Sequence, residues 1–236
     1  MKALLVSDIH ANIFALEAIW KQEKDSDVIY CAGDLVDYGP YPKEVIQWVQ
    51  EHNVICVKGN HDEKVAAFYR NQDSLWNVSD EERKWAHDNA QKLDETDVEF
   101  LENLPYSATF TLDAVGYSMQ HMYKGYETIQ SLHHYKEFWE HQTVEPIKSM
   151  SHKTMIFGHT HRRCIHHLGN TERWINPGSV SYRRPDDPDK TAHYMTITDG
   201  RIDMRHVKYD RSPLLQATLA NKLNQWERDV ALVFFG

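Results

Sequence analysis

The chain has 236 residues, of which 41% are hydrophobic and 26% are charged, and its net charge is −9 with histidine neutral. These values fit one ordinary globular domain, 1–236, and exclude the overall basic surface that nucleic-acid binding uses. No apolar run approaches the ~18–20 residues of a membrane span, and the first run is too short for a signal peptide. We therefore expect a cytoplasmic protein with no membrane or nucleic-acid partner.

The first sixty residues alternate between short apolar runs and helical patterns. Residues 3–6, 28–32 and 54–57 are predicted strands. One predicted helix runs from the cap residue Asn12 to about Glu23, and a second has Pro42 in its first turn. This strand–helix–strand–helix–strand order predicts an α/β fold with a largely parallel, helix-covered sheet.

Residues 71–105 are rich in charged and amide side chains and are predicted to form a helical insert. We interpret the insert as a lid or a substrate-selecting element, with a solvated helical elaboration as the alternative. Trp76 and Trp85, with Tyr69 nearby, would give this insert a face on which a nucleobase could stack.

The second half of the chain is predicted to be mainly β structure. Residues 107–112 and 115–120 form a predicted hairpin, and further short strands follow it at 154–157, 192–197 and 202–207. The C-terminal segment 212–236 is predicted to be a single surface helix from Ser212 to about Arg228, followed by an apolar end. That end packs on the core or on a partner, so a homodimer is one expectation.

The three cysteines are odd in number and widely spaced. We therefore expect Cys31, Cys56 and Cys164 to be reduced core thiols and not parts of a disulfide framework.

Five predicted strands each end in side chains that can bind a metal. These side chains are those of Asp8 and His10, Asp34, Asn60 and His61, His121, and His159 and His161. Sites in α/β sheets form beyond the carboxyl ends of strands, so all five strand ends can converge on one point. Gly33, Gly59 and Gly158 each precede a candidate ligand and allow a close backbone approach there.

This mixture of carboxylate, amide and imidazole ligands indicates the class of metal. It suits Mn, Fe, Co, Ni or Zn better than Ca, which prefers oxygen throughout. There are more candidates than one tetrahedral ion needs. Two ions that share a carboxylate would use them all, and such pairs, ~3.5–4 Å apart, suit in-line displacement at phosphorus. We expect manganese first among the possible metals.

The ordered blocks resemble the calcineurin-like metallophosphoesterase superfamily, most closely the small prokaryotic YfcE-type phosphodiesterases and their archaeal relatives. The stretches at 34–40 and 175–180 strengthen the resemblance, which runs from about residue 3 to about residue 207. It implies a β-sandwich with helices covering both sheets, in the order α-β-β-α. It also implies two-metal hydrolysis of a small phosphate ester or nucleotide, such as a dinucleoside polyphosphate or a cyclic nucleotide.

The resemblance further implies a role for each site residue. Asp8, His10 and His161 would hold the first metal, Asn60, His121 and His159 the second, and Asp34 would bridge the two. His61 would be the general acid that protonates the leaving oxygen, with Asp37 orienting it. A histidine near its ordinary pKa is suited to that task.

The sequence departs from related proteins at two positions. Tyr38 stands where protein Ser/Thr phosphatases carry an arginine, which argues against protein substrates. Met122 follows His121 where many relatives have glycine, so the loop at this position differs.

Several other polar residues are assigned no role in the site. Asp62 is predicted to cap or start the helix after His61. The pairs His133–His134 and His166–His167 are interpreted as surface or supporting residues, and Arg183–Arg184 as a solvated loop or a contact to a substrate phosphate.

Two other functional classes remain alternatives. A catalytically silent scaffold would resemble the metallophosphoesterase-fold subunit of the retromer coat, although such proteins tend to lose site residues. A nuclease is the second alternative, and the net charge of −9 does not favour it.

Overall fold

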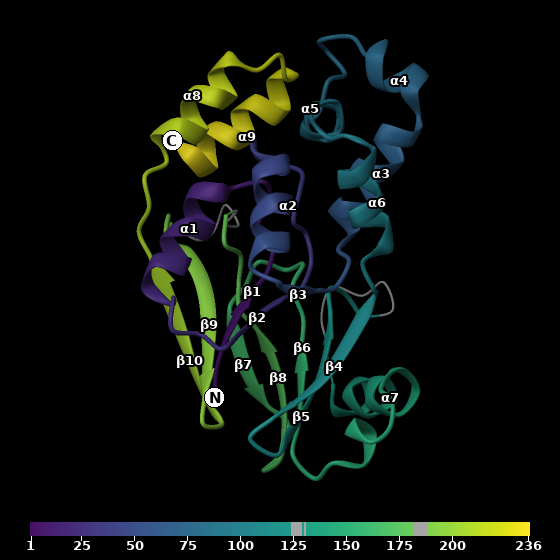
Figure 1. Cartoon of the computed structure of the whole chain (residues 1–236), viewed down its shortest axis with the longest axis vertical. Helices are drawn as coiled ribbons and strands as arrows, with labels where there is room; N and C mark the ends of the chain where they lie inside the picture. Colours follow the sequence, from purple (N-terminus) through teal and green to yellow (C-terminus); the bar gives the residue numbers. More distant parts are fainter. Residues whose placement is uncertain (124–128, 130, 182–187) are drawn as a thin grey trace.

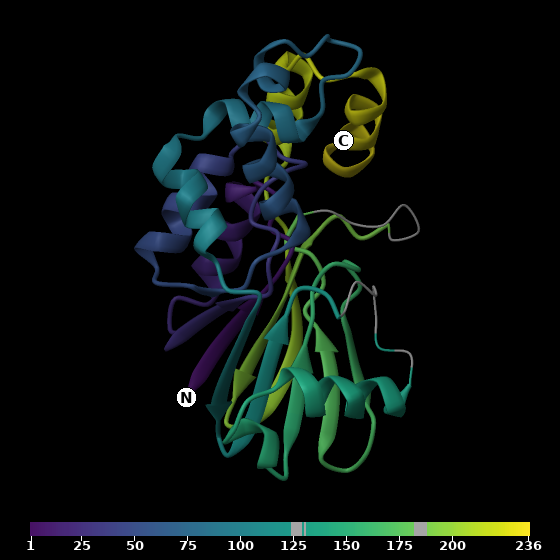
Figure 2. The same cartoon turned by 90° about the vertical axis from the view of Figure 1, so that its right-hand side faces the viewer.

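The computed structural model describes residues 1–123, 129, 131–181 and 188–236. Two five-stranded sheets lie face to face, with helices on the outer face of each (Figure 1; Figure 2). This arrangement confirms the predicted α-β-β-α sandwich.

The first sheet contains the strands predicted in the first sixty residues and two strands from the end of the domain. They are β1 (Lys2–Val6), β2 (Val28–Cys31), β3 (Ile55–Cys56), β9 (Ala192–Thr198) and β10 (Arg201–Val207). Their spatial order is β10-β9-β1-β2-β3. Strands β1, β2 and β3 are parallel, as predicted, and β9 pairs antiparallel with β1.

The second sheet is built from the middle of the chain. Its strands are β4 (Ser107–Leu112), β5 (Val115–Gln120), β6 (Lys153–Ile156), β7 (Cys164–His167) and β8 (Glu172–Asn176). Their order is β4-β5-β6-β8-β7. Strands β4 and β5 form the predicted hairpin, and β5, β6 and β8 run parallel. Three strand ends of this sheet therefore point to the same edge.

Helices cover the outer face of each sheet. On the first sheet lie α1 (Ile13–Gln22) and α2 (Pro42–Glu51) (Figure 1). The side chain of Asn12 caps α1 by accepting a hydrogen bond from the N–H of Ala15. On the second sheet lie α7 (Leu132–Gln142) and a short 3₁₀ helix (Ile147–Ser149).

Six further helices lie in the upper half of Figure 1, with α3 and α6 at about the height of α2 and the others higher. They are α3 (Asn60–Arg70), α4 (Gln72–Trp76), α5 (Trp85–Lys92), α6 (Glu95–Asn103), α8 (Ser212–Ala220) and α9 (Gln225–Phe235). The predicted insert at 71–105 is therefore helical.

The apolar core is divided by the sheets. Between them pack side chains such as Leu5, Tyr117 and Ile156. A larger cluster joins the first sheet to α1, α2 and the insert, and a third joins the second sheet to α7. The alternating faces of each strand thus bury apolar surface on both sides, which is the main stabilising contribution to the fold.

Three parts of the fold differ from the sequence prediction. The C-terminal segment is two helices and not one, because Asn224 caps a new helix by accepting from the N–H of Glu227. Helix α7 was not predicted, although Tyr135, Phe138 and Trp139 have helical spacing and are buried. The edge strand β7 was not predicted either, because its exposed residues have no apolar alternation.

The prediction that Trp76 and Trp85 both lie on an accessible base-stacking face is wrong for Trp85. Trp85 is fully buried against Leu214 and Phe235 of the C-terminal helices, whereas Trp76 is 61% exposed. The apolar C-terminus thus packs within its own chain through Phe235.

The cysteines form no disulfide, in line with the expectation of reduced thiols, and Cys31 and Cys56 are buried. Among the described residues, no helix combines the length and the apolar character that crossing a membrane requires.

Trp85 should therefore be a main contributor to stability. Replacing Trp85 with alanine should lower the free energy of unfolding by about 3–5 kcal/mol, the usual cost of deleting a buried aromatic side chain. Trp76→Ala in the same insert should change it by less than about 0.5 kcal/mol, because the side chain is exposed. Urea unfolding followed by circular dichroism compares the two variants, and equal effects would contradict the packing described here.

Candidate metal centre

The carboxyl ends of five strands bring the predicted ligands to one place. Asp8 follows β1, Asp34 follows β2, Asn60 follows β3, His121 follows β5 and His159 follows β6. Two groups of side chains form there, each with donor atoms within 4.8 Å of one another. One contains Asp8, His10 and His161, and the other contains Asp34, His121 and His159.

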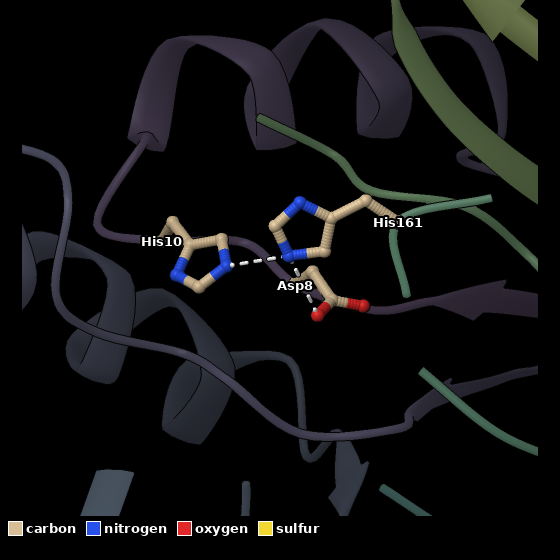
Figure 3. A group of neighbouring side chains, drawn as sticks. All are labelled: Asp8, His10 and His161. Carbon is tan, nitrogen blue, oxygen red and sulfur yellow. Dashed lines mark hydrogen bonds and ion pairs between the residues drawn. The ribbon is translucent and has the colours of Figure 1, made fainter. Parts of the chain in front are cut away.

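The first group is shown in Figure 3, with its three side chains pointing toward a common centre. Nε2 of His161 lies 3.2 Å from Oδ1 of Asp8 and 3.1 Å from Nε2 of His10. Nδ1 of His10 lies 3.3 Å from the carbonyl oxygen of Val36, which can only accept. Nδ1 therefore carries the proton, and Nε2 is left with a lone pair for a metal.

Burial and neighbouring charges fix the protonation of this group. Burial lowers the pKa of His10 to about 3, so its imidazole is neutral. Burial alone would raise the pKa of Asp8, but His161 beside it keeps that pKa below the ordinary value. An ionised carboxylate and a neutral imidazole are the states in which these residues bind metals.

The second group is centred on Asn60. Its Oδ1 lies 3.0 Å from both Nε2 of His121 and Nδ1 of His159. Nδ1 of His121 donates to the carbonyl oxygen of Ala32 at 2.7 Å, so Nε2 faces the group. An amide oxygen and imidazole nitrogens thus converge here, where the first group has a carboxylate with imidazole nitrogens.

Asp34 lies between the two groups. Its Oδ2 is 3.1 Å from Nε2 of His121 and 3.9 Å from Nε2 of His10. This oxygen is buried, and among the described residues its close contacts are with these imidazoles and not with a well-aligned hydrogen-bond donor. Burial opposes its ionisation, yet the adjacent histidines, His121 first, hold the pKa of Asp34 well below its ordinary value.

These observations fit a pair of cations. A buried carboxylate oxygen without a hydrogen bond is costly unless another positive group satisfies it. The donor set of carboxylate, amide and imidazole oxygens and nitrogens suits a transition metal. The residues that would hold two ions are therefore those predicted from the sequence, with Asp34 placed to contact both.

The backbone at the ligands is strained. Asp8, His10, Asp34, His159 and His161 all have left-handed backbone conformations, with φ between 49° and 65°. Such conformations are uncommon for residues other than glycine and cluster at functional sites. The sharp turns let each loop place its ligand directly at the strand end.

Two glycines allow the loops to approach one another closely. A Cβ atom on Gly59 would lie 2.0 Å from Oδ1 of Asp34, and one on Gly158 would lie 2.1 Å from Oγ of Ser7. Any side chain at either position would push the neighbouring ligand loop away.

Two supporting residues were not predicted for this role. The carboxylate of Asp62 accepts hydrogen bonds from the N–H groups of Gly59 and Leu35, each at 2.8 Å. Asn176, at the end of β8, donates to the carbonyl oxygen of Gly158 at 2.7 Å. Asp62 was predicted only as a helix start, which it also is. Asn176 was noted only as part of a motif.

His61 is held beside the two groups by an ion pair. Its Nδ1 lies 2.7 Å from Oδ2 of Asp37, which also accepts from Nζ of Lys64 at 2.8 Å. Nε2 of His61 faces Asp34 at 4.0 Å. Burial works against both charges, but the mutual contact raises the pKa of His61 and lowers that of Asp37 to about 2. Asp37 is therefore ionised at neutral pH, and its contact favours the protonated form of His61.

Tyr38 covers the same side of the site. Its ring centroid is 4.5 Å from that of His61 and 5.0 Å from that of His10. The remaining predicted candidates lie away from the ligands: His166 and His167 are exposed on β7, and His133 is exposed on α7. Arg183 and Arg184 lie outside the described residues.

Comparison with known proteins agrees with the family resemblance seen in the sequence. Residues 1–200 match the profile of the calcineurin-like phosphoesterase superfamily domain. The chain is 26% identical to the uncharacterized protein MJ0912 of Methanocaldococcus jannaschii, over 94% of this chain and 93% of that protein.

Two solved structures are similar in fold. A metallophosphoesterase from Sphaerobacter thermophilus has a TM-score of 0.74 at 21% identity, covering 99% of this chain and 100% of its own. Yfce, a phosphoesterase from E. coli, has a TM-score of 0.53 at 19% identity, covering 88% of this chain and 98% of its own.

Gly59 provides a test of the close loop packing. Gly59→Ala should strongly reduce the bound metal per chain, because the new Cβ atom would displace Asp34. Gly169→Ala is the matched control, since its nearest atom would be 3.5 Å away. Metal content by inductively coupled plasma mass spectrometry compares them. Full metal loading of Gly59→Ala would contradict the role given to this contact.

Metal affinity should rise with pH. Burial lowers the pKa of His121, but Asp34 outweighs burial and raises it to about 10, so His121 holds a proton at neutral pH without metal. A bound metal must displace that proton, so affinity should increase about tenfold per pH unit between roughly pH 7 and 9. Manganese titrations at several pH values measure this slope. His121→Asn has no such proton and should reduce the slope, and a flat profile of the wild type would disprove the assignment.

Proposed function

The chain belongs to the calcineurin-like phosphoesterase superfamily, and we propose that it hydrolyses the phosphoester bond of a small molecule at a two-metal centre. The observation that carries this proposal is the position of the His61–Asp37 pair. It lies beside Asp34, the residue between the two ligand groups. A histidine held by a carboxylate next to a paired metal site is an arrangement that suits phosphoester hydrolysis.

The metals would be held by the two groups of donors, with Asp34 between them. Two bound cations supply positive charge for the phosphoryl oxygens and lower the pKa of nearby water. We propose manganese as the first candidate, with iron, zinc, nickel and cobalt as alternatives, because the mixed donor set suits this group of metals.

His61 would provide the proton for the leaving group. As water replaces the ester oxygen on phosphorus, the bond from phosphorus to that oxygen breaks and His61 Nε2 gives the oxygen its proton. Asp37 orients His61 and favours its protonated form, while Lys64 donates to the same carboxylate oxygen and holds it in place. A general acid of this kind contributes ~10²–10⁴-fold to the rate.

A cavity beside the second ligand group favours a small substrate. It has a volume of about 220 Å³ and opens next to Asn60 and His121. The other lining residues are Lys58, Gly59, Glu63, Tyr106, Gln120, Met122 and Gln142. Gln120 and Gln142 bring two side-chain amides to this cavity, which can bind a polar ester group. We propose that the alcohol part of the substrate lies here.

The alternative functions have less support. A silent scaffold does not need the His61–Asp37–Lys64 contacts, which are fully formed. A nuclease needs a surface that attracts phosphate backbones, and the net charge of −9 opposes this. The proposed substrate therefore remains a small phosphate ester or nucleotide, with dinucleoside polyphosphates and cyclic nucleotides among the compounds to test.

The proposal predicts metal-dependent turnover that requires His61. The manganese-loaded protein should hydrolyse at least one phosphoester in a panel of monoesters, diesters and dinucleotides. His61→Ala should lower its turnover about 10²–10⁴-fold while the metal content stays the same. His166→Ala, an exposed histidine on β7, is the control and should keep full activity. Full metal loading without turnover of any phosphoester would disprove the proposed function and favour a scaffold.

A further inference from the structure

We propose that Asn89 of helix α5 is a positioning residue for the His61–Asp37 pair, so that the helical insert is a fixed part of the active site. The inference rests on the proposed phosphoester hydrolysis. It concerns how the acid is held and gives the insert at 71–105 a role other than that of a lid.

The side chain of Asn89 makes two hydrogen bonds to the loop that carries Asp37. Asn89 is fully buried. Its Oδ1 accepts from the backbone N–H of Asp37 at 2.9 Å, and its Nδ2 donates to the carbonyl oxygen of Gly39 at 2.8 Å. One amide group therefore satisfies a donor and an acceptor on the two sides of Tyr38. Asparagine fits here because it has one acceptor and one donor on the same short side chain.

The loop at residues 37–39 needs such contacts to keep its conformation. Asp37 and Tyr38 are both in left-handed conformations, with φ of 69° and 60°. Two successive residues of this kind are unfavourable without outside contacts. On its other side the loop packs closely against the backbone of His10. A Cβ atom on Gly39 would lie only 2.2 Å from the carbonyl oxygen of His10. Asn89 thus holds the strained residues 37–39 in close contact with the loop that carries His10.

The insert holds the loop at a second point on the same face of α5. Nζ of Lys92 donates to the carbonyl oxygen of Pro40 at 2.9 Å. Asn89 and Lys92 are three residues apart and therefore face the same side of the helix. Trp85, at the start of α5, is fully buried against the C-terminal helices. Helix α5 is therefore anchored in the fold at its start and bonded to the loop further along.

The contact matters for catalysis because Asp37 orients His61. The imidazole can give its proton only within hydrogen-bond reach of the leaving oxygen, about 2.6–3.2 Å. If the loop relaxes, the carboxylate of Asp37 moves and the 2.7 Å contact to Nδ1 of His61 changes with it. Asp34 lies in the same loop, but the N–H groups of Asp34 and Leu35 are held separately by the carboxylate of Asp62, so metal binding should be retained.

The test compares substrates that differ in their need for a proton. A 4-nitrophenolate group leaves without protonation, whereas an alkoxide must be protonated as it leaves. Asn89→Leu removes both hydrogen bonds with little change in volume. Gln91→Leu is the matched control, because the Gln91 amide on the same helix bonds only within the insert, to the carbonyl oxygen of Leu75 and to Arg83. Rates on a nitrophenyl and an alkyl phosphoester, metal content and thermal unfolding are measured for each variant.

Asn89→Leu should lose about 10- to 100-fold more activity on the alkyl ester than on the nitrophenyl ester, as a small misplacement of the acid does. Its metal content should equal that of the wild type, and His61→Ala should show the same preference more strongly. Gln91→Leu should leave the ratio of the two rates unchanged. An unchanged ratio in Asn89→Leu, with both rates lowered equally or not at all, would overturn the inference.

A second variant, Asn89→Asp, keeps the test decisive if Asn89→Leu does not fold. Asn89→Asp keeps the acceptor for the N–H of Asp37 but loses the donor to Gly39, and it should change the rate ratio in the same direction. If Asn89→Leu does not fold, the ratio measured for Asn89→Asp decides. Failure of the wild type to hydrolyse either ester would instead refute the proposed function, and the inference with it.

Discussion

The carboxylate of Asp62 fixes the geometry at the middle of the site. It accepts hydrogen bonds from four backbone N–H groups, those of Asp34, Leu35, Val36 and Gly59. Three of these lie in the loop after β2, and the fourth lies at the start of α3. A carboxylate has enough lone pairs to accept all four bonds at once. Asp34 and the start of α3, which carries Asn60, are therefore set relative to each other by one buried side chain.

These loops bring the imidazoles and two carboxylates close together in a buried site. Two imidazole nitrogens, on His10 and His161, face each other at 3.1 Å, and the carboxylates of Asp8 and Asp34 are both buried. Charge and lone pairs crowded in this way oppose folding, so apolar packing between and around the sheets has to offset them. Cations would turn the same crowding into a favourable interaction. Metal binding and folding stability should therefore be linked.

The features that could be predicted from the sequence are those with local signals. Each ligand-bearing strand end is an apolar run followed by a polar metal-binding residue, and the structure brings Asp8, Asp34 and His121 together as that pattern indicates. The sandwich order came from the family resemblance and is confirmed. The break between α8 and α9 was missed because the leucine spacing continues through it, although Asn224 is a cap signal.

Contacts between distant segments could not be predicted. Asn89 lies 52 residues from Asp37, within a polar insert where an asparagine resembles any solvated residue. Trp85 was misplaced for the same reason, since only the folded chain brings α8 and α9 over it. Nothing in the local sequence separates a buried amide from an exposed one.

Three separate parts of the chain meet at residues 37–39. The core contacts the loop through His10, and the insert contacts it through Asn89. Tyr38 packs against the cluster formed by the C-terminal helices. From α9 of those helices comes the buried Glu227, whose pKa burial and the charge of Asp37 raise to about 7. The match to the superfamily ends at residue 200, so α8 and α9 lie beyond the shared domain. The ligands thus come from the ends of the strands, whereas the surroundings of the acid come from the insert and the C-terminal helices.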